Sequence, residues 1–205
     1  MNFGFLASFI ALILVISITI RKQAKHTKES DEEFWSREHR ANNVRRKPLD
    51  NLNYIHIPLE KFPTNLMQDN SNVLECIDII ESLTSCKIVN FTGFSNTDLK
   101  LEYGTANLEL LTEYDQNYTV LVRTLQKWAD LLLESGYQQE ASVLMEYAVS
   151  IDTDISRTYY LLADYYVSCD KMVQIDYLKK KAETLRSANK EVILRNLREK
   201  YPDVF

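Results

Sequence analysis

The chain opens on a run of apolar side chains that basic residues end abruptly. Residues 3–20 contain no charged side chain, and Arg21 and Lys22 follow directly. With a rise of ~1.5 Å per residue, a helix of this length comes close to spanning a hydrocarbon core of ~30 Å. We therefore predict a transmembrane anchor over residues 1–20.

A cleaved secretory signal is the alternative interpretation of this segment. Such signals begin with basic residues and end at a small-residue cleavage site, whereas this chain begins Met-Asn-Phe-Gly and has no Ala-x-Ala pattern before Arg21. The basic residues that follow the apolar run, Arg21, Lys22, Lys25 and Lys28, favour the cytoplasmic side of a membrane. We expect an uncleaved single-pass anchor in the cell membrane, with the rest of the chain facing the cytoplasm.

After the anchor the pattern turns polar and then irregular. Residues 21–50 predict a basic juxtamembrane linker with one short helix at about 32–44. Phe34 and Trp35 give that helix an aromatic edge, which could lie at the lipid headgroups or pack on the domain.

Residues 51–121 predict an irregular strap followed by helices that cover the rest of the domain. Prolines discourage helix at the start of this region, whereas apolar residues recur at helical spacing over 71–85. A second covering helix is expected at 105–121. The stretch at 87–104 is expected to be irregular, and a strand within it could pair only with 54–57. Glycines and prolines are sparse along the whole chain, with four of each, so an all-α fold in one globular unit is expected.

The C-terminal half is similar to itself with a period of 34 residues. When 122–155 is aligned with 156–189, large, small and turn residues recur at the same places. The recurring pairs are Leu125 and Tyr159, Trp128 and Leu162, Ala129 and Ala163, Leu132 and Tyr166, Gly136 and Asp170, Ala141 and Ile175, Leu144 and Leu178, Ala148 and Ala182, and Ile151 and Leu185. A small residue beside large ones makes a notch that lets a paired helix approach closely.

This pattern resembles the tetratricopeptide repeat, a pair of antiparallel helices that stacks on the next pair. The second unit follows the family pattern well at Tyr159, Leu162, Ala163 and Tyr166. Lys179 departs from it at a place where an aromatic residue is usual, and Thr153 and Ser187 stand in place of the closing proline. The resemblance implies a short α-solenoid of two repeats at 122–189, closed by a capping helix and tail at 190–205. An ordinary helical bundle with chance periodicity is the alternative.

The resemblance also implies protein binding on the concave side, which the first helix of each pair forms. The side chains expected there are Arg123, Gln126, Lys127, Asp130, Arg157, Tyr160, Asp164 and Val167. This set mixes both charges and lacks the paired Lys and Asn pattern of repeats that clamp a terminal carboxylate. The same residues could instead be no more than a solvated face.

Charge and candidate chemistry argue against other classes of function. The net charge is +3 over residues 21–50, −12 over 51–170 and +4 over 171–205, and an acidic middle does not suit nucleic acid. The histidines, His26, His39 and His56, form no metal-ligand or triad spacing. We expect no enzyme activity, no cofactor, no metal and no small-molecule substrate.

Three hypotheses for function remain. The leading one is a membrane-anchored adaptor or scaffold that binds a partner protein through its helical repeats. The alternatives are a structural subunit of a larger membrane assembly and an exported binding or folding helper. The plan of anchor, basic linker and helical-repeat domain also resembles uncharacterised membrane proteins of Gram-positive bacteria, which implies no activity.

Overall fold

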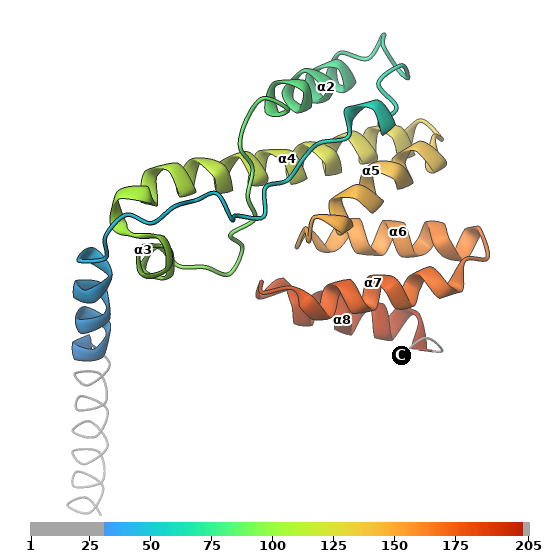
Figure 1. The fold of residues 1–205 in the computed structure, drawn as a ribbon. Coiled ribbons are helices and arrows are strands. Elements are labelled where there is room, and N and C mark those ends of the chain that lie inside the picture. Colours follow the sequence, from blue (N-terminus) through green and yellow to red (C-terminus); the bar gives the residue numbers. More distant parts are fainter. Residues whose placement is uncertain (1–30, 203–205) are drawn as a thin grey trace, which may run out of the picture. The chain divides into compact units, whose positions relative to one another are not determined.

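The computed structural model describes residues 31–202, and this part of the chain contains eight α-helices and no strand (Figure 1). The prediction of an all-α fold is thus confirmed for these residues. None of the helices within 31–202 is both long enough and apolar enough to cross a membrane. The anchor predicted for residues 1–20 lies outside the described residues.

The described residues form two compact units, where the sequence pattern predicted one. The smaller unit combines 31–47 with Ser95–Leu108, and the larger one combines Pro48–Phe94 with 109–202. Each unit is described separately below.

The smaller unit pairs a helix at 31–42 with helix α3, Asn96–Tyr103, and the short 3-10 helix η2, Thr105–Asn107. Lys100 and Thr97 of α3 both donate hydrogen bonds to the Glu38 carboxylate. These bonds hold the pKa of Glu38 below its usual range, with the Lys100 bond as the larger cause. Ala41 is fully buried. Helix α3 corrects the expectation that 87–104 would be irregular.

Local signals explain why α3 forms despite its weak apolar pattern. The Ser95 hydroxyl accepts a hydrogen bond from the Asp98 backbone N–H, and the Asp98 carboxylate accepts one from the Ser95 backbone N–H. This reciprocal capping box satisfies two of the backbone donors that a helix start leaves unpaired. Leu99 is the one residue of α3 that is buried.

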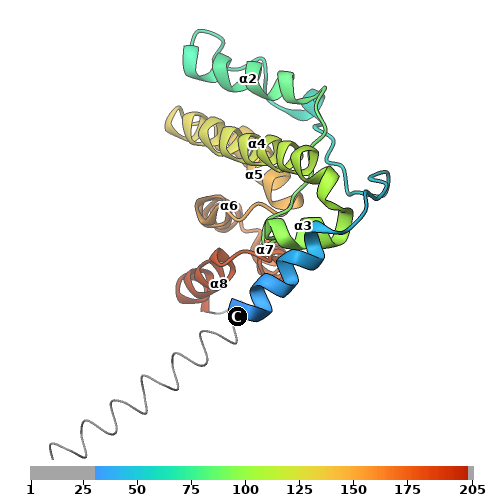
Figure 2. The same cartoon turned by 90° about the vertical axis from the view of Figure 1, so that its left-hand side faces the viewer.

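In the larger unit, successive helices pack on one another along the chain (Figure 1). They are α2 at Ser71–Leu83, α4 at Leu108–Glu134, α5 at Gln138–Ser150, α6 at Ser156–Ser168, α7 at Met172–Thr184 and α8 at Asn189–Lys200. Two views show α2 lying beside α4 (Figures 1 and 2). The helix expected at 105–121 is not separate from the first repeat helix, because no glycine or proline interrupts α4 between 108 and 134.

Most of the residues that recur with the 34-residue period lie in the core of this unit, whereas the turn residues Gly136 and Asp170 are exposed. Fully or almost fully buried members from α4 and α5 are Leu125, Trp128, Ala129, Leu132, Ala141, Leu144 and Ala148. Those from α6 and α7 are Tyr159, Leu162, Ala163, Tyr166, Ile175, Leu178 and Ala182. The small residues therefore face neighbouring helices, as their alternation with large residues predicts.

The strap before α2 runs along these helices and is held by a few specific contacts. Ile55 donates its backbone N–H to the Ile88 carbonyl oxygen at 2.9 Å, but no ladder of strand pairing follows. The 3-10 helix η1, Leu59–Lys61, leads to Phe62, whose ring lies edge-on to those of Trp128 and Tyr147. The strap thus closes one side of the core.

Buried and partly buried tyrosines make this fold sensitive to alkaline pH. Burial raises the pKa of Tyr147 to about 12, and it also raises the pKa values of Tyr118, Tyr159, Tyr166 and Tyr201. Below an ordinary pKa of ~10 the phenols are neutral in both states, whereas above it the unfolded chain ionises first. Stability is therefore expected to be full below pH ~10 and to fall steadily towards pH ~12.

Urea unfolding midpoints measured across that pH range would check this expectation. Tyr147→Phe removes one phenol, together with its hydrogen bond to the His56 carbonyl oxygen. The variant should lose some stability at neutral pH and show a shallower decline at alkaline pH. A midpoint that stays constant up to pH ~12 would contradict the assignment of buried, neutral phenols.

Candidate protein-binding surface

The eight candidate side chains lie on two helices of the larger unit. Helix α4 carries Arg123, Gln126, Lys127 and Asp130, and helix α6 carries Arg157, Tyr160, Asp164 and Val167. They differ in exposure and in what they bind, so the set divides into side chains that hold the helices together and side chains that remain accessible.

A hydrogen-bond network joins α4 to α6. Thr158 is buried and donates its hydroxyl to the Gln126 side-chain oxygen at 2.6 Å, and Gln126 donates its amide to Asp130 at 3.0 Å. Arg157 Nε then donates to both Asp130 carboxylate oxygens, at 2.9 and 3.2 Å. Gln126 is buried rather than exposed, so its predicted exposure is wrong. The reason is that its amide satisfies the buried Thr158 hydroxyl.

Helix α8 contacts the candidate residues at the other edge of α6. The Asn196 amide donates to the Tyr160 hydroxyl at 2.7 Å. The Asp164 carboxylate accepts from Lys200 at 2.5 Å and from the Tyr201 hydroxyl. Tyr160 and Asp164 therefore position the capping helix, and replacing them would disturb the fold as well as any binding surface.

Five of the eight candidates are exposed to solvent, and three of these five, Lys127, Arg157 and Asp164, form ion pairs. Arg123 is exposed and makes no ion pair among residues 31–202, and Val167 is 42% exposed. Lys127 pairs with Glu75 of α2 at 2.5 Å, although both side chains stay about half exposed. Exposed Arg157 pairs with Asp130 as described above.

The ion pairs on this face link different helices of the larger unit. Lys127 with Glu75 joins α4 to α2, Arg157 with Asp130 joins α6 to α4, and Lys200 with Asp164 joins α8 to α6. Exposed pairs of this kind contribute only ~0–1 kcal/mol each to stability. These charged groups can consequently leave their present partners and pair with charges of a bound protein at little cost in free energy.

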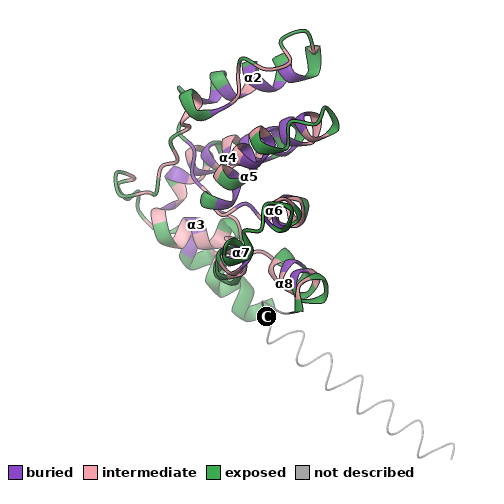
Figure 3. Cartoon of the chain, turned by 90° about the vertical axis from the view of Figure 1, so that its right-hand side faces the viewer, coloured by how far each residue is buried: buried purple, intermediate pink, exposed green. Residues whose placement is uncertain are grey.

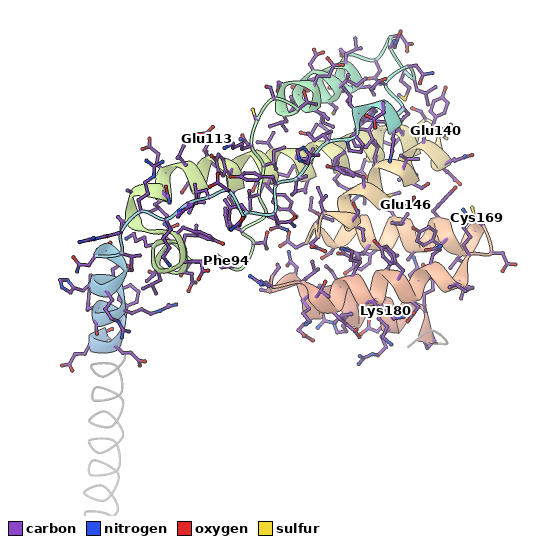
Figure 4. All side chains as sticks on the ribbon, viewed as in Figure 1. Phe94, Glu113, Glu140, Glu146, Cys169 and Lys180 are labelled. Atoms are coloured by element: carbon purple, nitrogen blue, oxygen red, sulfur yellow. The ribbon has the colours of Figure 1, made fainter. Side chains whose placement is uncertain are left out.

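Exposed apolar side chains lie near the turn between α6 and α7, and the pattern analysis identified only Val167 among them. Val167, Met172 and Tyr177 are each about 40% exposed, and Val173 is 84% exposed. Val173 is apolar but falls outside the recurring core positions of the 34-residue alignment. That combination in the sequence could have identified Val173 as an exposed apolar residue. Figure 4 labels Glu146 of α5 and Cys169, which directly follows the end of α6. Glu146 accepts a hydrogen bond from the buried Tyr166 hydroxyl.

A polar cavity of about 280 Å³ lies elsewhere in the larger unit, lined by Asn53, Asn90, Thr92, Phe94, Asp152, Thr184, Leu185 and Arg186. The Arg186 guanidinium lies over the Phe94 ring, 4.9 Å from its centre. Within residues 31–202, no group of three or more His, Cys, Asp or Glu side chains is placed to hold a metal ion.

Comparison of the chain with protein-family models, with curated proteins and with solved structures found no match in any of the three.

Proposed function

We propose that this protein is a membrane-anchored, non-enzymatic adaptor whose tetratricopeptide-like helices bind a partner protein at the cytoplasmic surface of the cell membrane. The apolar run at 3–20 and the basic residues after it support the anchor and its orientation. The observation that carries the binding role is the repetition of backbone geometry at the 34-residue period.

That repetition is clearest at the turns inside each proposed repeat. Tyr137 donates its backbone N–H to the Leu132 carbonyl oxygen at 2.9 Å, and Lys171 donates to that of Tyr166 at 2.8 Å. Gly136 and Asp170, one residue earlier, both have positive φ, at 85° and 57°. Residues 34 apart thus close equivalent turns, which supports two related helix pairs over 122–189.

The departures from the family pattern also recur at equivalent places. The Thr153 hydroxyl accepts a hydrogen bond from the Ile155 backbone N–H at 3.3 Å, and the Ser187 hydroxyl accepts one from Asn189 at 3.1 Å. Hydroxyl side chains can form such local turns in place of a backbone turn. Thr153 and Ser187 stand where the family pattern has its closing proline, at the junction to the next helix. Their hydroxyl groups thus stabilise a turn that the proline would otherwise favour.

Helix α8 supports the proposal as the cap of a short solenoid. Two repeats leave an apolar end that a further helix must cover. Ile193 and Leu197 of α8 are buried, whereas Glu191, Arg195 and Arg198 on its other sides are exposed. A helix with one apolar stripe and one charged face is typical of a terminal capping element.

Affinity isolation in mild detergent tests the binding role. Arg123→Glu with Lys127→Glu reverses two exposed charges on the proposed face, and both side chains lie outside the core. We expect the full-length protein to capture a specific partner and the double variant to lose most of that capture. The variant should keep the far-ultraviolet circular dichroism of the original protein.

A control variant, Lys180→Glu with Arg195→Glu, changes the net charge by the same amount at exposed positions on α7 and α8 that are not among the eight candidates. Lys180, labelled in Figure 4, forms an exposed ion pair with Asp176 of α7 at 2.6 Å, comparable to that of Lys127 with Glu75. Equal loss of capture in both variants, or in neither, would contradict binding through the face of α4 and α6.

A structural subunit of a larger membrane assembly is the second candidate function. The exposed apolar side chains near the turn between α6 and α7 favour it, because apolar surface gathered in one region often marks contacts between proteins. In that case a partner should co-purify in fixed stoichiometry, and Val173→Glu rather than Arg123→Glu should release it.

A further inference from the structure

The helix at 31–42 exposes two aromatic side chains side by side. Phe34 is 54% exposed and Trp35 is 66% exposed, and their ring centres lie 5.4 Å apart in an edge-on arrangement. Figure 3 shows this helix coloured mostly as exposed. Exposure of two large aromatic rings to water is unfavourable, since each could bury a large apolar area elsewhere.

The exposed pair continues the face by which this helix packs. Phe34, Glu38 and Ala41 are spaced by four and three residues and so lie on one stripe of the helix. Ala41 is fully buried, and Glu38 is held by Lys100 of α3. The C-terminal part of the stripe is thus covered by the smaller unit, whereas its aromatic N-terminal part is uncovered within residues 31–202.

The sequence before this helix indicates what covers the aromatic pair. Ten residues, 21–30, separate the apolar run from the described part of the helix. At ~3.5 Å per residue they reach at most ~35 Å, so an anchor in the bilayer keeps the helix within about that distance of the membrane surface and leaves the headgroups within reach of the aromatic pair. Trp and other amphipathic aromatic side chains concentrate in that interfacial layer.

The charges around the pair favour apolar insertion over attraction to anionic lipids. Asp31, Glu32 and Glu33 are the first described residues of the helix and are acidic, next to Phe34. Arg37 and Arg40 follow one turn later, but Arg37 pairs with Asp98 of α3 at 2.5 Å. Because these acidic residues offset the neighbouring basic side chains, the aromatic rings supply the contact with lipid.

We propose that Phe34 and Trp35 insert into the interfacial layer of the bilayer that holds the anchor, as a second membrane contact of the smaller unit. This inference rests on the membrane attachment in the proposed function but not on partner binding. The contact holds the helix at 31–42 against the membrane surface. The distance between this helix and the membrane then depends on the aromatic contact as well as on the linker at 21–30.

Intrinsic fluorescence tests this contact, because the chain contains only two tryptophans. Trp35 is exposed, whereas Trp128 is fully buried in the core of the larger unit. The full-length protein and Trp35→Phe would be reconstituted in phosphatidylcholine vesicles, with and without brominated acyl chains, and the Trp35 emission obtained as their difference. Flotation of the vesicles would verify attachment separately.

The expected result is a blue-shifted Trp35 emission that brominated lipid quenches strongly and aqueous acrylamide quenches weakly, while the Trp128 emission in Trp35→Phe is unaffected by bromine. A protein that floats but whose Trp35 remains open to acrylamide would overturn this inference alone. Protection from acrylamide without quenching by brominated lipid would also overturn it, in favour of a protein contact. Failure to float would overturn the membrane attachment and this inference with it.

Discussion

Trp128→Ala is expected to lower the free energy of unfolding of the larger unit by about 3–5 kcal/mol, the range typical of large-to-small changes in a core. The Trp128 side chain is fully buried and packs edge-on to Phe62 of the strap. Its indole nitrogen makes no hydrogen bond within the described part of the chain. The loss is therefore one of packing, and removal of the ring leaves a cavity at the centre of the helix stack.

Trp35→Ala is the matched control, because it removes the same side chain from an exposed position. In detergent, urea unfolding followed by circular dichroism should show a change within ~0.5 kcal/mol for that variant. Trp128→Phe should fall between the two, since it keeps an aromatic ring in the core. Equal stabilities of Trp128→Ala and Trp35→Ala would contradict the burial of Trp128 against the strap.

Gly104→Ala is expected to destabilise the smaller unit by more than the ~1–3 kcal/mol that an unfavourable backbone conformation usually costs. Gly104 has a φ of +90° and lies between α3 and η2. A Cβ atom there would collide with the backbone carbonyl of Arg45. Backbone cannot move aside as a flexible side chain can, so the chain segments at 45–47 and 103–107 would have to separate.

Gly136→Ala separates this steric effect from the effect of φ. Gly136 also has a positive φ, of +85°, but a Cβ atom there would meet no other atom within 4 Å. We expect a clearly smaller loss for Gly136→Ala than for Gly104→Ala. Hydrogen exchange at the amides of α3 would report the damage to the smaller unit, and unchanged protection there in Gly104→Ala would contradict the close approach.

The helices with a strong apolar period were predictable close to their observed ends. The pattern at 71–85 corresponds to α2 at Ser71–Leu83, and the capping segment at 190–205 begins within one residue of α8, Asn189–Lys200. Side chains buried at a period of 3.6 dominate the stability of such helices. The turn at Gly136 was predictable for a similar reason, because a positive φ favours glycine.

Helix α3 was missed because its stability does not come from an apolar stripe. It buries only Leu99, and it depends on the Ser95 and Asp98 capping box and on ion pairs of Asp98 and Lys100 with residues about 60 positions away. The Ser-x-x-Asp spacing at 95–98 was a signal in the sequence. The partners of α3 in the helix at 31–42 were not, because no local pattern specifies which distant segment will pair with it.

For the candidate binding face, too, the sequence pattern predicted one part and the packing of distant segments decided the other. Periodicity placed all eight side chains on α4 and α6, since helical spacing dictates which residues share a face. Whether each stays accessible depends on the neighbouring helices: Thr158 buries Gln126, and α8 occupies Tyr160 and Asp164, whereas Arg123 and Val167 remain exposed. Local spacing thus specifies helices and their faces, but accessibility and pairing follow from contacts between segments far apart in the chain.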